Sequence, residues 1–523
     1  MKKNLLYTLY FSLIIALSSC YKDKGNYDLI DLNEVAIDTS NLNIKPSYSL
    51  DRFDTLTIAP EIIYNGEIVK NIDTFKDKIE ITWTIYQATT GIAVHSLDTL
   101  SNDLILKKPI NKPSGLWVVK MSVKDLQYQT ETFTKFQVNV NEIIADGWMV
   151  LYEKDGLTDV GLIVDERVKV GVVKNKLFTD LIKDHNPTPL YGKPVALLHP
   201  TSTLTKGKDV IVMTDKQLLG LSRESFEVSY KMNDFFWALP STINFQAFST
   251  NFTASKEFMI NNNRIHTLSM TTIGFDRKNT KYSPPIGNDN YEIAAWQPKK
   301  YLSSLDGVFY DAKGKKFMKL TANSTQLINF SSTPAGAFDL NNVGLDLINY
   351  DWGYLSASPA THNEYLLMRN STNTYLIVAN FNVGVEAQIP VNKINLTNSP
   401  DINNTVSMAV AYAGQYLLYA SPNSVYLNKF NTAQNAEVLW KCPDGEVITD
   451  IQLQKFYYNA FHLANILPNA NKYVYFATWN ESTKNGKIYS YEINPTNGDI
   501  NLSTERVYEG FGKIKEMTYK WGL

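Results

Sequence analysis

Three tryptophans at nearly equal spacing are the residues of this sequence best suited to binding a ligand. Trp237, Trp296 and Trp352 are 59 and 56 residues apart. An indole ring has a large apolar face and one N–H donor, so it can stack against a sugar, an aromatic group or a peptide. The candidate ligand-binding set is these three and the aromatic and acidic residues near them: Phe236, Tyr350, Tyr354, Asp234 and Asp351. The same spacing suits core residues wedged between repeated units, and both interpretations stay open.

Residues that would indicate a catalytic or metal centre form no recognisable pattern. The six histidines are scattered, and neither His-x-x-x-His nor Cys-x-x-Cys, which would predict zinc, is present. The sequence also lacks a glycine-rich phosphate loop and a Gly-x-Ser-x-Gly nucleophile motif. Carboxylates are plentiful, but sequence alone cannot pair two of them as the acid and base of a glycosidase. We therefore expect no metal, no cofactor and no catalysis, with a polysaccharide hydrolase or lyase as the alternative.

The first twenty residues predict export and a lipid anchor. Lys2 and Lys3 precede an apolar run at residues 5–17, which has the length of a secretory signal and is short for a membrane span. The run ends in LSSC, which resembles the bacterial lipobox, where small residues precede a cysteine whose thiol carries the lipid. We expect residues 1–19 to be a signal peptide, Cys20 to be lipidated and residues 20–35 to be a flexible tether.

The composition favours a globular β protein and excludes several other classes. Lys and Arg number 50 and Asp and Glu number 52 among 523 residues, so there is no basic surplus for binding nucleic acid. Aromatic residues make up 12%, a load that favours strands. The two cysteines, Cys20 and Cys442, exclude a multi-disulfide scaffold. If Cys20 carries a lipid, Cys442 has no disulfide partner in its chain and is expected to be inert.

Residues 36–143 show the short strands of an Ig-like β-sandwich. Strand patterns occupy residues 56–64, 79–86, 116–124 and 133–140, and Asn65-Gly66 after the first of them is a strong hairpin turn signal. Trp83, in the middle of the second pattern, and Trp117, in the third, are expected to be core residues.

The third strand carries a family resemblance. Its sequence, GLWVVKMSVKD, resembles the Gly-x-Tyr-x-Val-x-Leu-x-Val-x-Asp strand of PKD-type domains, with Trp117 in place of the tyrosine. Together with CYKDKGNY from Cys20 onward, it makes the chain resemble the PKD-like lipoproteins of Bacteroidetes. That resemblance implies a cell-surface lipoprotein of the outer membrane that serves SusC/SusD-type, TonB-dependent importers. It implies transporter proteins as partners and a peptide, a glycan or a metal complex as ligand. The Asp-Thr-Leu tripeptides at Thr55 and Thr99 resemble the O-glycosylation motif of exported Bacteroidetes proteins.

Residues 144–523 repeat a hairpin of two apolar strands. The first strands of these hairpins start at residues 148, 210, 258, 308, 365, 416 and 473. Hairpins repeating at roughly 50 residues predict the blades of a β-propeller. Seven blades are expected, or eight if residues 269–300 contain a further hairpin. The strand at residues 514–519 has no partner in the last repeat, so we expect it to complete the first blade and close the ring.

These elements would place the three tryptophans in the connections between blades, on one face of the ring around its channel. Three functions remain open on this basis. The first is a non-catalytic ligand-binding or docking accessory of an importer. The second is a propeller hydrolase or lyase, which requires a carboxylate pair or a His–carboxylate set at the channel mouth. The third is a structural subunit of an outer-membrane complex, whose tryptophan-bearing face would be blocked or flat.

Overall fold

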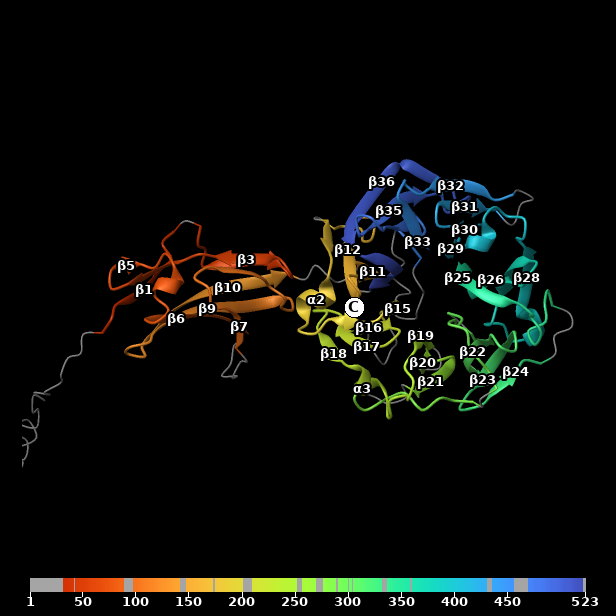
Figure 1. The fold of residues 1–523 in the computed structure, drawn as a ribbon, viewed down its shortest axis with the longest axis horizontal. Helices are drawn as coiled ribbons and strands as arrows, with labels where there is room; N and C mark the ends of the chain where they lie inside the picture. The colour runs from red at the N-terminus through yellow and green to blue at the C-terminus, as the bar shows by residue number, and fades with distance from the viewer. Residues whose placement is uncertain are drawn as a thin grey trace, which may run out of the picture. The chain divides into compact units, whose positions relative to one another are not determined.

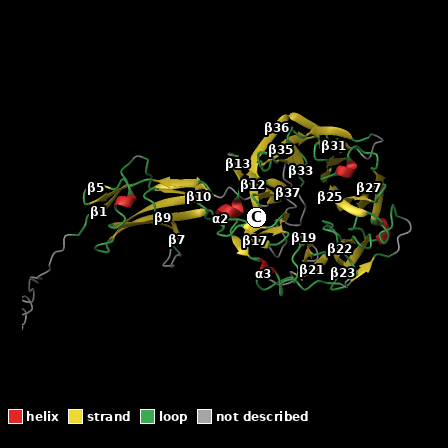
Figure 2. Cartoon of the chain, viewed as in Figure 1, coloured by secondary structure: helices red, strands yellow, loops and turns green. Residues whose placement is uncertain are grey.

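Strands build almost all of the structure, in two compact units, Met1–Asn141 and Glu142–Leu523. The computed structural model describes residues 32–41, 43–88, 97–141, 147–172, 175–200, 209–251, 256–269, 276–287, 290–299, 301–302, 304–331, 336–357, 360–429, 435–455 and 469–520, with the backbone alone described at 251, 354–357 and 360–361. Figure 2 shows how strands dominate both units. The helices within the described ranges are short: α2 (Leu181–His185), α3 (Met232–Phe235) and 3-10 turns at Ile72–Thr74, Glu386–Gln388 and Ile402–Asn404. The all-β prediction is confirmed.

The predicted signal peptide and lipid attachment point, Cys20, lie outside the described residues. Searched over the described part of the chain, no helix has the length and apolar character needed to cross a bilayer.

The first unit is a β-sandwich. Its strands are β1 (Val35–Asp38), β2 (Ser47–Asp51), β3 (Thr55–Ile58), β4 (Glu61–Tyr64), β5 (Glu67–Ile68), β6 (Ile79–Gln87), β7 (Asp98–Ser101), β8 (Leu106–Pro109), β9 (Gly115–Asp125) and β10 (Glu131–Asn141). One sheet has the order β2-β10-β9-β6-β7, and shorter sheets β1-β4-β5 and β3-β8 share its core. Alternate residues of β6 are buried because side chains alternate between the two faces of a strand. Trp83 is fully buried there and stacks on Phe136 with ring centroids 6.2 Å apart.

The run at residues 56–64 forms two strands rather than one. β3 pairs with β8, whereas β4 pairs with β1 and β5. Pro60 lies between them, and proline has no N–H to continue a ladder of hydrogen bonds. Asn65 and Gly66 then turn β4 into β5 with φ angles of 48° and 78°, the positive values that a type I′ hairpin turn requires.

The second unit is a β-propeller, whose sheets form a ring that runs from yellow to blue in Figure 1. Within the described residues there are seven sheets. The first sheet consists of β37 (Lys513–Lys520), β11 (Gly147–Lys154), β12 (Leu157–Val164), β13 (Lys176–Phe178) and β14 (Leu190–Tyr191), and the second of β15 (Pro194–Leu198), β16 (Asp209–Thr214), β17 (Leu218–Ser222) and β18 (Val228–Tyr230). The third sheet consists of β19 (Phe245–Asn251), β20 (Lys256–Asn261) and β21 (Arg264–Ser269), the fourth of β22 (Leu305–Asp311), β23 (Lys316–Thr321) and β24 (Leu327–Asn329), and the fifth of β25 (Asp346–Ala357), β26 (Ala360–Arg369), β27 (Thr374–Ala379) and β28 (Pro390–Asn395). The sixth sheet consists of β29 (Ser407–Val410), β30 (Leu417–Ala420), β31 (Ser424–Asn428) and β32 (Glu437–Lys441), and the seventh of β33 (Glu446–Leu453), β34 (Tyr473–Asn480), β35 (Asn485–Ile493) and β36 (Ile500–Phe511).

The core of the ring lies between successive sheets. Phe258 of β20 meets Phe309 of β22 edge to face at 5.4 Å, and Trp440 of β32 lies 5.0 Å from Phe476 of β34, between ring centroids. Because each sheet buries both faces against its neighbours, the paired central strands read as near-continuous apolar runs in the sequence. This explains why the repeat is visible without an alignment.

The described residues within 269–300 form backbone hydrogen bonds to the edge strands of two neighbouring sheets. The backbone N–H groups of Ser283 and Ile286 donate to β21, at the outer edge of the third sheet. Ala294 donates to Tyr310 of β22 and Ile293 forms a bridge with Asp311, so residues 292–294 pair with the end of β22 in the fourth sheet. The described part of this stretch therefore completes two sheets that each show three regular strands.

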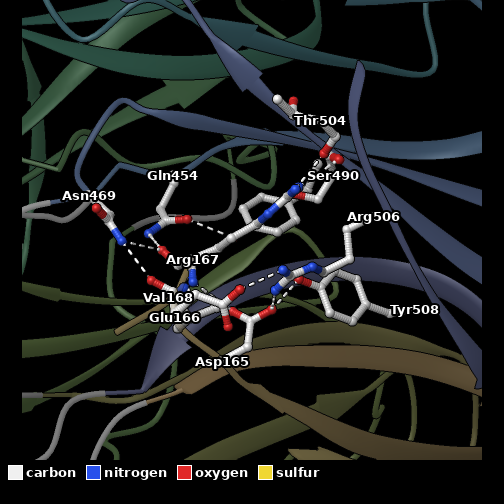
Figure 3. Close-up of polar contacts among 11 residues, drawn as sticks. Asp165, Glu166, Arg167, Val168, Gln454, Asn469, Ser490, Thr504, Arg506 and Tyr508 are labelled. Carbon is white, nitrogen blue, oxygen red and sulfur yellow. Dashed lines mark hydrogen bonds and ion pairs between the residues drawn. The ribbon is translucent and has the colours of Figure 1, made fainter. Parts of the chain in front are cut away.

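The last strand joins the first sheet. β37 pairs antiparallel with β11, with Trp148 opposite Tyr519. A second connection is polar: the loop after β12 bonds to β35 and β36, as Figure 3 shows. Asp165 accepts from Arg506 at 2.8 Å and from the Tyr508 hydroxyl, while Arg167 donates to the carbonyl of Ser490 at 2.8 Å. Both connections tie the first sheet to the end of the chain.

Candidate ligand-binding cavity

Six of the seven sheets surround one cavity of about 780 Å³. Its walls come from β37, β15, β19, β25, β29 and β33 and from residues 295–299, which follow the segment that pairs with β22 of the fourth sheet. Strands of successive sheets contact one another around it, for example β33 with β37 and β37 with β15. Ligand sites in proteins are typically cavities of about 300–1,000 Å³, so this space has the size of a binding site.

Four of the eight ligand-binding candidates line the cavity. Trp296, Tyr350, Asp351 and Trp352 all contribute to its wall. Tyr350 is enclosed by the ring, which raises the pKa of its hydroxyl, helped by the charges of Glu516 and Glu364. Even so, 42% of its surface stays exposed. Tyr350 therefore offers an aromatic face to a molecule in the cavity.

The two cavity tryptophans are mostly buried, as the core interpretation expects. Trp296 is 1% exposed and packs against Phe317 and Phe381 at 5.7 and 5.8 Å between ring centroids. Trp352 is 8% exposed and stacks flat on His362 at 5.4 Å. Trp352 also lies within β25, not in a connection between blades. These two indole rings therefore form part of the packed wall and leave little surface for a ligand to contact.

The group around Trp237 lies elsewhere. Trp237 follows α3, is 65% exposed and is absent from the cavity wall. Phe236 is buried and stacks on Phe245 at 6.0 Å, and Asp234 accepts from the backbone N–H of Lys231 at 2.9 Å, which caps the start of α3. Equal spacing along the chain thus does not bring the three tryptophans together. The side chain of Tyr354 lies outside the described residues.

Asp351 is bound to a lysine that sequence reasoning missed. Lys455 forms an ion pair with the Asp351 carboxylate and donates to the carbonyl oxygens of Trp352 and Val410 at 2.6 and 2.9 Å. Its ammonium also lies 4.9 Å from the Trp352 ring centroid. Burial lowers the pKa of Lys455, while Asp351 opposes that shift. The group joins the fifth, sixth and seventh sheets, so Asp351 stabilises the ring.

Two further carboxyl groups of the cavity wall were also missed. Asp450 lies on β33 and accepts from the Ser407 hydroxyl at 2.7 Å; Glu516 lies on β37 and accepts from the Leu197 N–H at 3.0 Å. Burial raises the pKa of Asp450 to about 7 and raises the pKa of Glu516, and the charge of Glu516 adds to the shift of Asp450. In the sequence each is an acid within a strand, a signal that does not show that the two strands are neighbours.

Two N–H donors of the wall have no acceptor among the described residues. They are the side-chain amide of Gln297, which is 9% exposed, and the indole N–H of Trp296. Both belong to the irregular segment at residues 295–299 of the cavity wall. A search of the described residues for groups of His, Cys, Asp and Glu that could hold a metal ion finds none.

The fold and the cavity define a β-propeller protein with an N-terminal PKD-like β-sandwich. Residues 20–194 match the PKD-like family, a range that includes the sandwich and strands β11–β14 of the first sheet of the ring. No curated protein matches the sequence.

Several solved structures are similar in fold. A quinonprotein alcohol dehydrogenase-like protein from Bacteroides thetaiotaomicron is 11% identical with a TM-score of 0.48, over 91% of this chain and 96% of that one. The β-propeller domain of Swd1 from Myceliophteria thermophila is 9% identical with a TM-score of 0.36, over 61% and 88%. The WD40 domain of SCAP from fission yeast is 10% identical with a TM-score of 0.33, over 61% and 74%.

Proposed function

We propose that this protein binds a small ligand in the central cavity of its propeller, without transforming it. The cavity is the observation that carries this function: it has the size of a ligand site, an exposed aromatic ring in Tyr350 and polar groups from several sheets. Asp351 and Lys455 satisfy each other, so their role is to hold the wall in place.

The location and partners belong to the same proposal. The LSSC sequence ending at Cys20 and the PKD-like match support a lipid-anchored protein on the surface of an outer membrane. There the sandwich would act as a spacer, and the propeller would present its ligand to a SusC/SusD-type, TonB-dependent importer. Thr55 and Thr99, the candidate O-glycosylation sites, are both exposed on the sandwich.

Purification from the native outer membrane in mild detergent tests the proposal. Mass spectrometry of the eluate should identify both a transporter and a bound small molecule. The Cys20→Ala variant is the control for the anchor and should lose fatty-acid labelling and membrane association. Recovery of no transporter would exclude the importer role, and labelling of the Cys20→Ala variant would exclude this cysteine as the anchor.

A polysaccharide hydrolase or lyase is the second candidate, favoured by Asp450 and Glu516. Buried carboxyl groups with raised pKa values at one cavity can serve as general acids, which work best when the pKa lies near the working pH. Release of reducing ends from a polysaccharide by the wild-type protein, lost in Asp450→Asn and in Glu516→Gln, would establish this function. Binding without product release would support the binding function instead.

A further inference from the structure

We infer that the ligand of the cavity is an uncharged polyhydroxyl molecule, a sugar unit, bound by Asp450, Glu516 and Gln297 and stacked on Tyr350. The inference rests on the proposed function, because it names the class of ligand that the same cavity takes. It assigns roles to three residues outside the sequence candidates.

The carboxyl pair forms one side of the site. Asp450 and Glu516 lie on β33 and β37, which contact each other. Asp450 accepts from the Ser407 hydroxyl at 2.7 Å and, at 3.3 and 3.4 Å, from the side-chain amide of Gln452, whereas Glu516 accepts from the Leu197 N–H. A carboxylate has about four acceptor positions, so both groups keep capacity for a ligand. Burial raises both pKa values, that of Asp450 to about 7, so Asp450 is partly protonated near neutral pH and can also donate. A hydroxyl group matches such a partner, since it donates and accepts at one atom.

The charges around this pair favour a neutral ligand. Lys299 and Lys515 act on Glu516 and stabilise its ionised form, so positive charge already stands near the pair. Lys515 acts on Asp450 as well. A cationic ligand would meet these lysines, and an anionic ligand would meet the carboxylates.

The donors of the segment at residues 295–299 form another side of the site. Gln297 has an amide N–H without an acceptor in the described residues and is about nine-tenths buried on the cavity wall. A buried donor left unpaired destabilises the protein, and a ligand oxygen that accepts from it removes this cost. The indole N–H of Trp296, on the same segment, is likewise a buried donor without an acceptor in the described residues. The ligand must therefore carry acceptors as well as donors.

Tyr350 adds the apolar surface. It is the exposed aromatic ring of the wall, whereas Trp296 and Trp352 are nearly covered. A sugar presents hydroxyls around its rim and a patch of C–H groups on its face, so one molecule can stack on Tyr350 and hydrogen-bond with the carboxyl pair and Gln297. A peptide backbone shares part of this chemistry and is the competing class in the test.

Calorimetric titration of the full chain with defined probes decides the class. The probes are maltohexaose, xylohexaose, mannohexaose and chitohexaose, with a neutral Gly-Ser hexapeptide and spermidine as competitors. We expect an oligosaccharide to bind, with affinity about tenfold weaker in Glu516→Gln and in Tyr350→Leu, which correspond to the loss of a charged hydrogen bond and of a stacking contact. The control Trp237→Ala, outside the cavity, should bind as the wild type does. Thermal unfolding of every variant checks that it is folded.

The outcomes separate the inference from the function on which it rests. Binding of the hexapeptide or spermidine, sensitive to Tyr350→Leu, with no oligosaccharide bound, would keep the cavity as a ligand site and overturn the sugar class. Oligosaccharide binding unchanged in both cavity variants would overturn the assigned site. Failure of every probe would overturn the sugar class too. If the protein purified from its native membrane also held no small molecule, the binding function itself would be wrong.

Discussion

The Nη1 atom of Arg506 lies 2.8 Å from the Oδ2 atom of Asp165, and this ion pair joins residues 341 positions apart. Asp165 is buried and also accepts from the hydroxyl of Tyr508 and from the backbone N–H groups of Arg167 and Val168. It therefore fastens the first sheet to the last one (Figure 3), next to the pairing of β37 with β11. A propeller without such a closure would leave two open sheet edges.

Replacing Asp165 should weaken the closed ring. In Asp165→Asn the carboxylate that Arg506 and Tyr508 share is lost, and we expect the free energy of unfolding to fall by about 2 kcal/mol. Urea unfolding followed by tryptophan fluorescence measures this change. Glu481→Gln is the matched control, because its ion pair with Lys484 is exposed and glutamine can still accept from the Trp479 indole N–H, so we expect a much smaller change in stability. Equal effects of the two variants would contradict the role of Asp165.

Truncation of two of the recurring tryptophans should change the stability of the protein to very different extents. Trp296→Ala opens a cavity among Phe317 and Phe381, and we expect a loss of about 3–5 kcal/mol. Trp237→Ala removes an exposed ring, so we expect a change within about 0.5 kcal/mol. The midpoints of urea unfolding compare the two directly. A large loss in Trp237→Ala would show that its ring packs against something in solution.

The Lys455–Asp351 pair should show strong coupling. Lys455→Met leaves the Asp351 carboxylate with the Val410 N–H but without its cation, and we expect a loss of about 3–5 kcal/mol. The double variant Lys455→Met with Asp351→Leu should recover part of this loss, because no unpaired charge remains buried. A double-mutant cycle of unfolding free energies measures the coupling, and additive losses would argue against a paired clamp.

Asp450 should make the protein less stable as the pH rises. Its pKa is about 7 in the folded state against 3.8 for an ordinary aspartate, so the folded state binds more protons between those values. The free energy of unfolding should therefore decrease from about pH 4 to about pH 7, by on the order of 2–4 kcal/mol from this group. Asp450→Asn should flatten that decrease and stabilise the protein above pH 7. A profile unchanged by the substitution would contradict the raised pKa.

Much of the fold was predictable because the apolar strand pattern of each repeat can be recognised in a short stretch of sequence. Val210 and Phe258, which begin predicted hairpins, lie in β16 and β20, and the apolar runs reflect sheets buried on both faces. The orphan strand near Ile514 was expected beside the first blade, and β37 pairs there with β11. The break at Pro60 is also a local signal, although residues 56–64 were expected to form a single strand.

The site was much less predictable, because its residues are far apart in the sequence and lie close together only in the folded ring of sheets. Periodicity selected Trp237 together with Trp296, yet a helix and an irregular segment place these two in different surroundings. Asp450 and Glu516 are acids in separate strands, and Lys455 lies two residues after β33, the strand that carries Asp450. Their proximity depends on how successive sheets rotate about the axis, which no local pattern in the sequence records.

Site-directed photo-crosslinking at Tyr350 tests the central claim, ligand binding in the propeller cavity, most directly. A benzoylphenylalanine residue is introduced at position 350, or at position 237 as the control, and the protein is irradiated in its native membrane before mass spectrometry. We predict a small-molecule adduct at position 350 and none at position 237. No adduct at position 350, or the same adduct at both positions, would contradict a ligand site in this cavity.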